Sequence, residues 1–255
     1  MAIHVELLGT GGYYANDRRH TPCVLFPELS LALDGGSSLF RIADRLKSSE
    51  LRLFLTHAHL DHIVGLPYLL MPLLLKKLDR VTLHGTQETL DAVHNHLLST
   101  PVFPVAIPWE CEVISGTGSL ALDSQHTLFW QPLPSHPGGS MAYRIEQVQE
   151  SRKTIVSYIT DTTVDGTYTA FIHQSDLLIH ECNFPDQCAE LAEKSGHSIA
   201  SDVAHLAVTA QVRQMVVVHV DPSVKEEDPV GIPEMRLIFP DTQLGVDGLM
   251  FDVDS

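Results

Sequence analysis

The sequence predicts an α/β protein in which two sheets pack face to face with helices on both outer faces, an αββα sandwich. Short β-branched or alternating apolar runs recur along the chain, and helical patterns lie between them. At 255 residues, 44% of them hydrophobic, the chain can bury a sizeable core. We therefore expect one domain over residues 1–255.

The expected elements follow from the apolar periodicity, and no repeat, low-complexity segment or linker interrupts them. Strands are expected near residues 3–8, 22–26, 30–34, 51–55, 80–84, 111–115, 126–132, 140–147, 154–160, 176–180, 214–219 and 249–253. Helices are expected near residues 37–48, 63–77, 87–98, 165–173, 185–194 and 198–209. Strands begin each half of the chain, and helices flank them.

The segment His57-Ala58-His59-Leu60-Asp61-His62 concentrates metal-binding side chains directly after an apolar run that ends at Leu55. Imidazole and carboxylate groups are preferred ligands of zinc and its first-row neighbours. Solvated loop histidines are the alternative, but four donors in one tight turn favour a metal site. The spacing lets His57 and His59 chelate one ion while Asp61 and His62 reach a second.

Further candidate ligands follow other apolar runs. His136 follows residues 131–135, Asp161 ends the run 154–160, and His219 ends the run 215–218. Strands would deliver these residues to one edge of a sheet, and sites in open α/β sheets lie at the carboxyl ends of strands.

These motifs resemble those of the metallo-β-lactamase superfamily, and within it the ribonuclease Z-like phosphodiesterase branch. Thr56 to Leu70 is the closest match. The other matching segments are residues 7–12, 33–36, 83–85, 136–145, 161–163 and 246–250, and they occur in the family's order along nearly the whole chain. The resemblance implies the αββα fold and a hydrolase that uses two divalent metal ions.

The resemblance also implies a ligand set. His57, His59 and His136 would bind the first ion, Asp61, His62 and His219 would bind the second, and Asp161 would bridge them. Two such ions hold a shared hydroxide, a nucleophile available at neutral pH. Asp61 could ligate or move a proton, and the sequence leaves both roles open. Zinc is favoured, with manganese and iron as alternatives, because the ligands are histidines and carboxylates.

Two further residues are predicted to be catalytic. In ribonuclease Z-like enzymes, pairs similar to His180-Glu181 and His197-Ser198 lie beside the metals. The resemblance implies that His197 stabilises charge on the phosphate or protonates the leaving oxygen, and that Glu181 orients it. The alternative is that Ser198 caps a helix and His197 lies on the surface.

The substrate is predicted to be small. Ribonuclease Z carries a long basic arm between its third histidine and its bridging aspartate, and this arm grips tRNA. Only 24 residues separate His136 from Asp161 here, and the net charge is −16. Few cations are present for phosphate contacts, which argues against long nucleic acids. A cyclic nucleotide, a cyclic sugar phosphate or a short oligonucleotide fits better.

Other functions of the same fold remain open. A ribonuclease Z-like tRNA endonuclease is one alternative, and a hydrolase of lactones, thioesters or lactams is another, since the same nucleophile attacks carbonyl groups. A non-catalytic binding module is a third, although the complete ligand set argues against it. Residues 57–66 also resemble the metal motif of class II cyclic-nucleotide phosphodiesterases, with a departure at Tyr68.

The remaining expectations concern location and assembly. Four scattered cysteines, no signal peptide and no apolar stretch of about 20 residues predict a cytoplasmic protein that does not enter a membrane. Residues 63–75 are more apolar than one buried helix face requires. In ribonuclease Z-like proteins this helix lies in a homodimer interface. We therefore expect a homodimer through the helix near 63–77.

Overall fold

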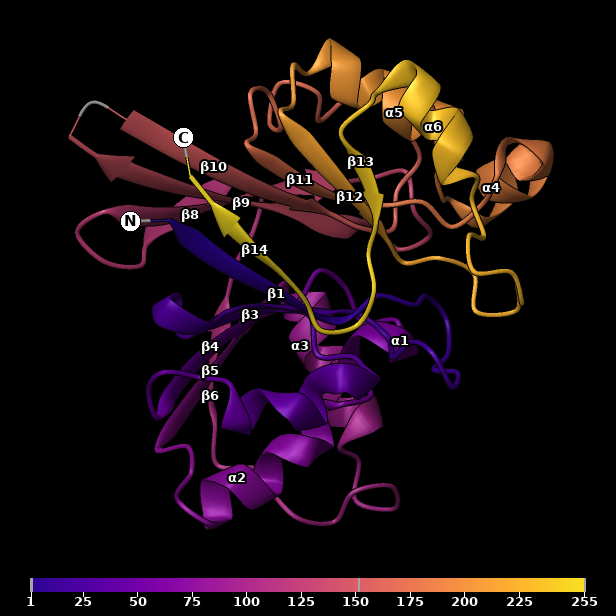
Figure 1. Cartoon of the computed structure of the whole chain (residues 1–255). Coiled ribbons are helices and arrows are strands. Elements are labelled where there is room, and N and C mark those ends of the chain that lie inside the picture. Colours follow the sequence, from indigo (N-terminus) through magenta and orange to yellow (C-terminus); the bar gives the residue numbers. More distant parts are fainter. Residues whose placement is uncertain (1, 151, 255) are drawn as a thin grey trace. The chain divides into compact units, whose positions relative to one another are not determined.

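The computed structural model describes residues 2–150 and 152–254, which form two compact units. The N-unit contains His4–Ser115 and Asp247–Phe251. The C-unit contains Gly116–Val246 together with the residues at the two ends of the chain. Each unit contains one mixed sheet of seven strands (Figure 1). A few residues at the ends of the first and last strands of the chain are grouped with the C-unit, although both strands belong to the N-unit sheet.

The N-unit sheet combines antiparallel and parallel pairs. Its strands, in sheet order, are β14 (Leu249–Val253), β1 (Ile3–Gly9), β2 (Cys23–Phe26), β3 (Leu31–Leu33), β4 (Glu50–Phe54), β5 (Arg80–Gly85) and β6 (Glu110–Val113). The pairs β3–β4, β4–β5 and β5–β6 are parallel. The carboxyl ends of these four strands therefore lie at one edge of the sheet.

Most helical segments of the N-unit pack on its sheet. These are η2 (Ser37–Asp44), α1 (Leu60–Ile63), η3 (Leu66–Leu69), α2 (Leu70–Leu74), α3 (Gln87–Ala92) and the π-turn η4 (Val93–Leu97), whereas η1 (Pro27–Leu29) has no buried residue. The core joins strand residues such as Leu53 and Leu83 to helix residues such as Leu66, Leu69 and Leu90. Burial of this apolar surface is the main force that holds the helices on the sheet.

Residues 63–77 do not form the single helix that the sequence predicts. The chain forms the separate short segments α1, η3 and α2 instead. Pro67 and Pro72 explain the breaks, because proline lacks an N–H donor and disfavours a helical conformation in the residue before it. The apolar character was predicted correctly, but the two prolines divide the helix.

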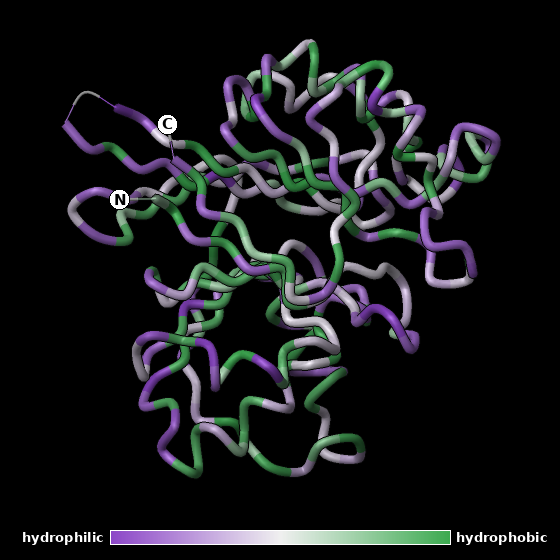
Figure 2. The backbone as a smooth tube through the Cα atoms, in the orientation of Figure 1, coloured by the Kyte–Doolittle hydropathy of each residue, from purple (hydrophilic) through white to green (hydrophobic). Residues whose placement is uncertain are grey.

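The C-unit sheet is built in the same way. Its strands, in sheet order, are β13 (Thr242–Leu244), β12 (Gln214–Val218), β11 (Leu177–Glu181), β10 (Arg152–Ile159), β9 (Ser140–Gln149), β8 (His126–Leu133) and β7 (Gly118–Ala121). The strands β10 to β13 are parallel, and β7 to β10 are antiparallel. Figure 2 colours long stretches of these strands as hydrophobic, whereas the ends of β9 and β10 near residue 150 are hydrophilic.

Helices η5 (Asp186–Cys188), α4 (Ala189–Ser195), α5 (Ala200–Thr209) and α6 (Ile232–Ile238) belong to the C-unit. Val203 and Ala207 of α5 pack with Met235 of α6 and with Met215 and Val217 of β12. This core fixes the carboxyl end of β12, where His219 follows.

The helix predicted over 165–173 is wrong, because these residues form turns. The Asp165 carboxylate accepts hydrogen bonds from the backbone N–H and hydroxyl of Thr167, and Gly166 has φ +81°. Such a side-chain turn competes with a helix. The short elements β7, β13 and α6 were not predicted. The two mixed sheets with their helices agree with the predicted αββα class.

None of the helices among the described residues has the length and the apolar character that crossing a membrane requires.

Candidate metal centre

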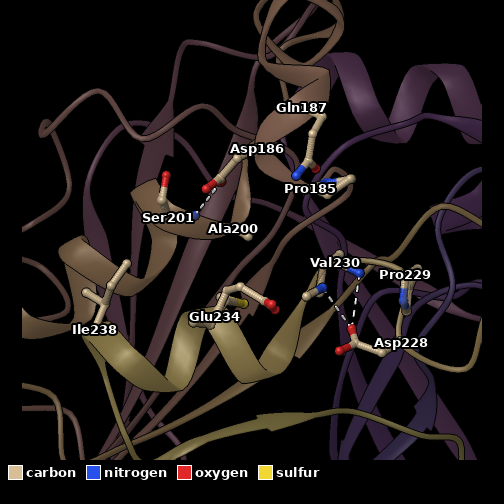
Figure 3. Close-up of a pocket in the computed structure, with 12 residues that line it drawn as sticks. Pro185, Asp186, Gln187, Ala200, Ser201, Asp228, Pro229, Val230, Glu234 and Ile238 are labelled. Carbon is tan, nitrogen blue, oxygen red and sulfur yellow. Dashed lines mark hydrogen bonds between the residues drawn. The ribbon is translucent and has the colours of Figure 1, made fainter.

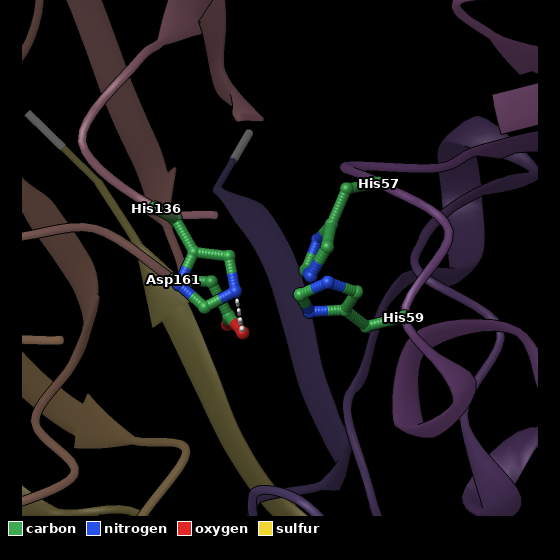
Figure 4. A group of neighbouring side chains, drawn as sticks. All are labelled: His57, His59, His136 and Asp161. Atoms are coloured by element: carbon green, nitrogen blue, oxygen red, sulfur yellow. Dashed lines mark ion pairs between the residues drawn. The ribbon is translucent and has the colours of Figure 1, made fainter. Parts of the chain in front are cut away.

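The first set of predicted ligands lies in the turn after β4 in the N-unit. His57 and His62 are buried, and His59 is exposed at the start of α1. The ring centroid of His57 lies 4.5 Å from that of His59 and 4.3 Å from that of His62. Figure 4 shows the rings of His57 and His59 next to each other. The turn therefore brings the three imidazoles of His57, His59 and His62 close together.

Asp34 holds this turn from the end of the neighbouring strand β3. Its fully buried carboxylate accepts hydrogen bonds from Thr56 N (2.8 Å) and Thr56 Oγ1 (2.9 Å), and it lies 2.9 Å from Nδ1 of His62. A carboxylate accepts, so Nδ1 of His62 carries the proton and Nε2 keeps its lone pair. Metal-binding histidines commonly have such a partner. Asp34 is not among the site residues that the sequence predicts.

Asp61 is held from two sides within the N-unit. Its Oδ2 accepts a hydrogen bond of 2.9 Å from the backbone N–H of Tyr13 and lies 3.5 Å from Nε2 of His62. Asp61 and His62 therefore turn donor atoms toward one another, as two ligands of one ion would.

The C-unit brings the other predicted residues to one edge of its sheet. Glu181 ends β11, and Asp161 and His219 follow the parallel neighbours β10 and β12. His136 follows β8, whose end pairs with the start of β9 through Leu133 and Ser140. Because β9 is antiparallel to both β8 and β10, the end of β8 lies at the same edge.

The two carboxylate oxygens of Asp161 face two different imidazoles. Oδ2 lies 3.6 Å from Nε2 of His136, and Oδ1 lies 3.3 Å from Nε2 of His219 (the first pair is dashed in Figure 4). Ligands at about 2.0–2.1 Å from a tetrahedral ion lie roughly 3.3 Å apart. Asp161 and His219 also have φ values of 47° and 54°. Such values are uncommon outside glycine and occur often at functional sites.

The orientation of His136 depends on Gly196. Nδ1 of His136 donates a hydrogen bond of 3.0 Å to the Gly196 carbonyl, which leaves Nε2 with a lone pair toward Asp161. Gly196 has φ +73° and ends α4. A Cβ atom at this position would lie 2.7 Å from Pro137 Cδ and 2.9 Å from His136 Cα. Only glycine fits this close approach.

His197 and Glu181 form the pair that the sequence predicts. Nδ1 of His197 lies 2.9 Å from Oε1 of the fully buried Glu181, and its ring centroid lies 4.8 Å from that of His136 and 5.3 Å from that of His219. Glu181 also accepts hydrogen bonds from the backbone N–H groups of Thr162, Asn183 and Ser198. These donors fix the carboxylate that orients His197.

The helix-cap alternative for this segment is not supported. The N-cap of α5 is Ile199, without a side-chain cap, and the Ser198 hydroxyl donates instead to the Thr162 carbonyl at 2.6 Å. The side chain of His197 is only 11% exposed. His197 therefore lies among the C-unit donors and not on the open surface.

The neighbouring His180 has a structural role. Its Nδ1 lies 2.6 Å from the Glu181 carbonyl, and its Nε2 lies 2.9 Å from the Tyr168 hydroxyl. Burial lowers the pKa of His180, although the carbonyl and the charge of Glu181 act in the opposite direction. A neutral, doubly hydrogen-bonded imidazole of this kind holds Tyr168 in the core.

A pocket of about 330 Å³ in the C-unit lies between the start of α5 and α6, and its lining contains none of the predicted site residues (Figure 3). Its carboxylates serve the backbone. Asp228 accepts hydrogen bonds from Val230, Gly231 and Ile232 N–H, and Asp186 accepts one from Ser201 N–H. These bonds satisfy donors at helix starts, which is a structural role.

Two mixed sheets, histidine and aspartate donors at strand ends and a carboxylate-oriented histidine define a metal-dependent hydrolase of the α/β class. The model of the "Beta-lactamase superfamily domain" matches residues 43–220, and the chain belongs to this family. Within it, the chain is a ribonuclease Z-like member.

Individual relatives agree with this assignment. A ribonuclease Z of Bradyrhizobium diazoefficiens is 28% identical over 243 residues, covering 77% of this chain and 80% of the relative. The metallo-β-lactamase fold protein YhfI of Bacillus subtilis superposes with a TM-score of 0.78 at 21% identity, covering 98% and 99% of the two chains. The short form of human tRNase Z gives 0.76 at 18% identity, covering 99% and 100%. These similarities confirm the predicted fold class.

Proposed function

We propose that this hydrolase is a dinuclear phosphodiesterase that cleaves a small phosphodiester, such as a cyclic nucleotide, a cyclic sugar phosphate or a short oligonucleotide. The clustered histidine and aspartate side chains support the binding of divalent metal ions. The observation that carries the proposal is the His197–Glu181 pair next to His136 and His219. A carbonyl hydrolase has no need of this additional oriented histidine.

The proposed ligands are seven histidine and aspartate residues. His57, His59 and His136 would hold the first ion, Asp61, His62 and His219 the second, and Asp161 both. Two observations support this set. His62 and His136 each have Nδ1 engaged with an acceptor, so their Nε2 atoms are available as ligands. The two oxygens of Asp161 also face separate imidazoles. Bound ions would supply an activated water and neutralise phosphate charge.

His197 is proposed as the residue that acts on the phosphate. Its Nδ1 engages Glu181, so Nε2 is the atom that can donate a proton to the leaving oxygen or stabilise negative charge. Glu181 is a positioning residue, because its carboxylate accepts hydrogen bonds from three backbone N–H groups. Asp61 is proposed as a ligand, because its Oδ2 lies 3.5 Å from Nε2 of His62, and as a carrier of a proton during attack.

The segment between His136 and Asp161 supports a small substrate. The strands β9 and β10 take up most of it, so its described residues have no room for a basic arm. The net charge of −16 also disfavours affinity for long nucleic acids. Zinc is the proposed metal, with manganese and iron as alternatives for the same ligands.

A substrate screen of metal-reconstituted protein tests this function. It compares bis-p-nitrophenyl phosphate, 2′,3′- and 3′,5′-cyclic nucleotides, a thioester, a lactone and a pre-tRNA. We expect turnover of at least one small phosphodiester and no cleavage of the pre-tRNA. Dominant thioester or lactone hydrolysis would favour the carbonyl alternative, and efficient pre-tRNA cleavage would favour the tRNA endonuclease.

We also propose that two copies associate through the segment near residues 63–77. Leu66, Leu69 and Leu73 are buried in the N-unit core, whereas Met71, Leu74 and Leu75 are 55%, 59% and 63% exposed. These exposed apolar side chains support a surface that binds a partner.

The proposed location is the cytoplasm, which the four free cysteines support. The proposed organisation is one hydrolase domain over residues 1–255.

A further inference from the structure

The loop between β1 and β2 presents two neighbouring aromatic side chains to solvent. Tyr13 is 77% exposed and Tyr14 is 44% exposed. Their ring centroids lie 5.3 Å apart at an interplanar angle of 69°. Neither ring is needed for the core, so their exposure calls for another explanation.

This loop is tied to the candidate metal centre within the N-unit. The backbone N–H of Tyr13 donates the 2.9 Å hydrogen bond to Asp61 Oδ2, and Tyr13 has φ +58°. A tyrosine in this left-handed conformation is strained, and the bond to Asp61 helps to hold it there. The Tyr13 side chain therefore begins next to a proposed metal ligand.

The loop is also held rigidly at its base. Gly11 N–H donates to the His20 carbonyl at 2.9 Å, and the Asp247 carboxylate accepts hydrogen bonds from Thr10 N–H and His20 N–H. Near the tip, Asn16 Oδ1 accepts hydrogen bonds from Arg18 N–H and Arg19 N–H, both at 2.9 Å. A platform that is ordered before binding loses little entropy when a ligand stacks on it.

We propose that Tyr13 and Tyr14 form a stacking platform for the nucleobase of the substrate. The inference rests on the proposed function, and it narrows the substrate class to phosphodiesters that carry a nucleoside, in preference to cyclic sugar phosphates. Every nucleobase has a π-face, and stacking on aromatic side chains strengthens binding by about tenfold or more per base. Stacking also suits a chain with net charge −16, because it does not depend on cations.

The first test compares two diesters with the same leaving group, thymidine 5′-p-nitrophenyl phosphate and methyl p-nitrophenyl phosphate. We expect kcat/KM to favour the thymidine compound, and the ratio of the two values to fall about tenfold in Tyr13→Asn and further in Tyr13→Asn/Tyr14→Ser. Asparagine tolerates positive φ, so it removes the ring and keeps the loop conformation. Tyr13→Phe and Tyr14→Phe are the matched controls that keep the ratio.

A second test does not depend on turnover. Calorimetry compares the binding of thymidine 5′-monophosphate with that of ribose 5-phosphate, and only the former should bind more weakly to the double variant. Variants that merely displace Asp61 would lower both kcat/KM values equally and keep the ratio, which would overturn the platform. Equal binding of the two phosphates by the wild-type protein would also overturn it. Absence of any phosphodiester turnover would refute the proposed function, and the binding comparison would still decide the stacking inference.

Discussion

The Asp34 carboxylate lies 2.9 Å from Nδ1 of His62, and both side chains are fully buried. Asp34 thereby selects the tautomer of a proposed metal ligand and, through Thr56, fixes the turn that carries it. We predict that Asp34→Asn lowers metal affinity by about 10- to 100-fold, the usual effect of losing such a partner. Competition with a chromogenic chelator measures this change.

The control for this experiment is Asp44→Asn. Asp44 has a side chain that is 76% exposed, and it pairs with Lys77 on the surface of the N-unit. The Asp44→Asn variant should bind metal with the affinity of the wild-type protein. If Asp34→Asn also bound metal with wild-type affinity, Asp34 would have no role beyond folding the turn.

Asp161 is predicted to serve both ions. Elemental analysis of fully metallated protein should find about two ions per chain. Asp161→Ala should lower the occupancy of both sites, because each carboxylate oxygen faces a different imidazole. Asp254→Ala, which removes an 82% exposed carboxylate of the C-unit, is the control that should keep both ions. Full metal content in Asp161→Ala would refute the bridging assignment.

His197 and Glu181 are predicted to act on turnover and not on metal binding. His197→Ala should keep its metal and lose roughly a hundredfold or more in kcat on a phosphodiester, as expected for removal of a general acid. Glu181→Gln should retain the backbone hydrogen bonds that an amide oxygen can accept, and it should lower kcat less than His197→Ala does.

The separate effects on kcat and KM distinguish positioning by Glu181 from a purely structural role. Because Glu181 holds Nδ1 of His197, Glu181→Gln should lower kcat and keep KM close to the wild-type value. An unchanged kcat would reduce Glu181 to a structural residue of β11.

His84 is predicted to make stability depend on pH. Burial, together with the positive charge of Arg52, lowers the pKa of His84 from 6.5 to about 4. His84 stacks on Phe54 at 4.0 Å, and its buried Nε2 has no hydrogen-bond partner in the described part of the chain. Since the unfolded chain binds this proton first, the free energy of unfolding should fall as pH drops from about 6.5 to about 4, and the effect should level off below that.

Urea unfolding at several pH values, in the presence of a chelator to exclude metal release, measures this effect. His84→Gln should show a weaker decline of stability between pH 7 and pH 5 than the wild-type protein does. His96→Gln, which replaces an exposed histidine, should keep the wild-type slope. Equal slopes in all three proteins would contradict the prediction.

Much of the fold and most of the candidate site could be predicted from the sequence. Proposed ligands such as Asp161 and His219 directly follow β-branched runs. Because strands that run in the same direction end at the same edge of a sheet, these runs are enough to place the C-unit residues at one sheet edge. Asp34 also directly follows a strand, β3, but its role could not be predicted in this way, because its partner His62 is 28 residues away and their contact depends on β3 and β4 being neighbours.

The mistakes also have physical causes. The segment 63–77 has the apolar composition of one long helix, but Pro67 and Pro72 interrupt it. The turn at 165–173 depends on a single side chain, Asp165, which competes with helical hydrogen bonds. Composition and periodicity average over such single residues, so a pattern-based reading misses them.

The last prediction concerns the apolar surface of the segment near residues 63–77. Leu74 is 59% exposed, next to the exposed Leu75 and Met71, while Leu73 between them is buried. If this surface joins two copies in a two-fold dimer, Leu74→Glu would place a charge at each of two equivalent positions and oppose association. Light scattering on dilute protein should give a dimer mass for the wild-type protein and a monomer mass for Leu74→Glu. The control is Leu237→Glu, which changes an 86% exposed leucine of α6 in the C-unit and should leave the dimer intact. A wild-type protein that stays monomeric, with Leu74→Glu unchanged in mass and stability, would rule out this interface.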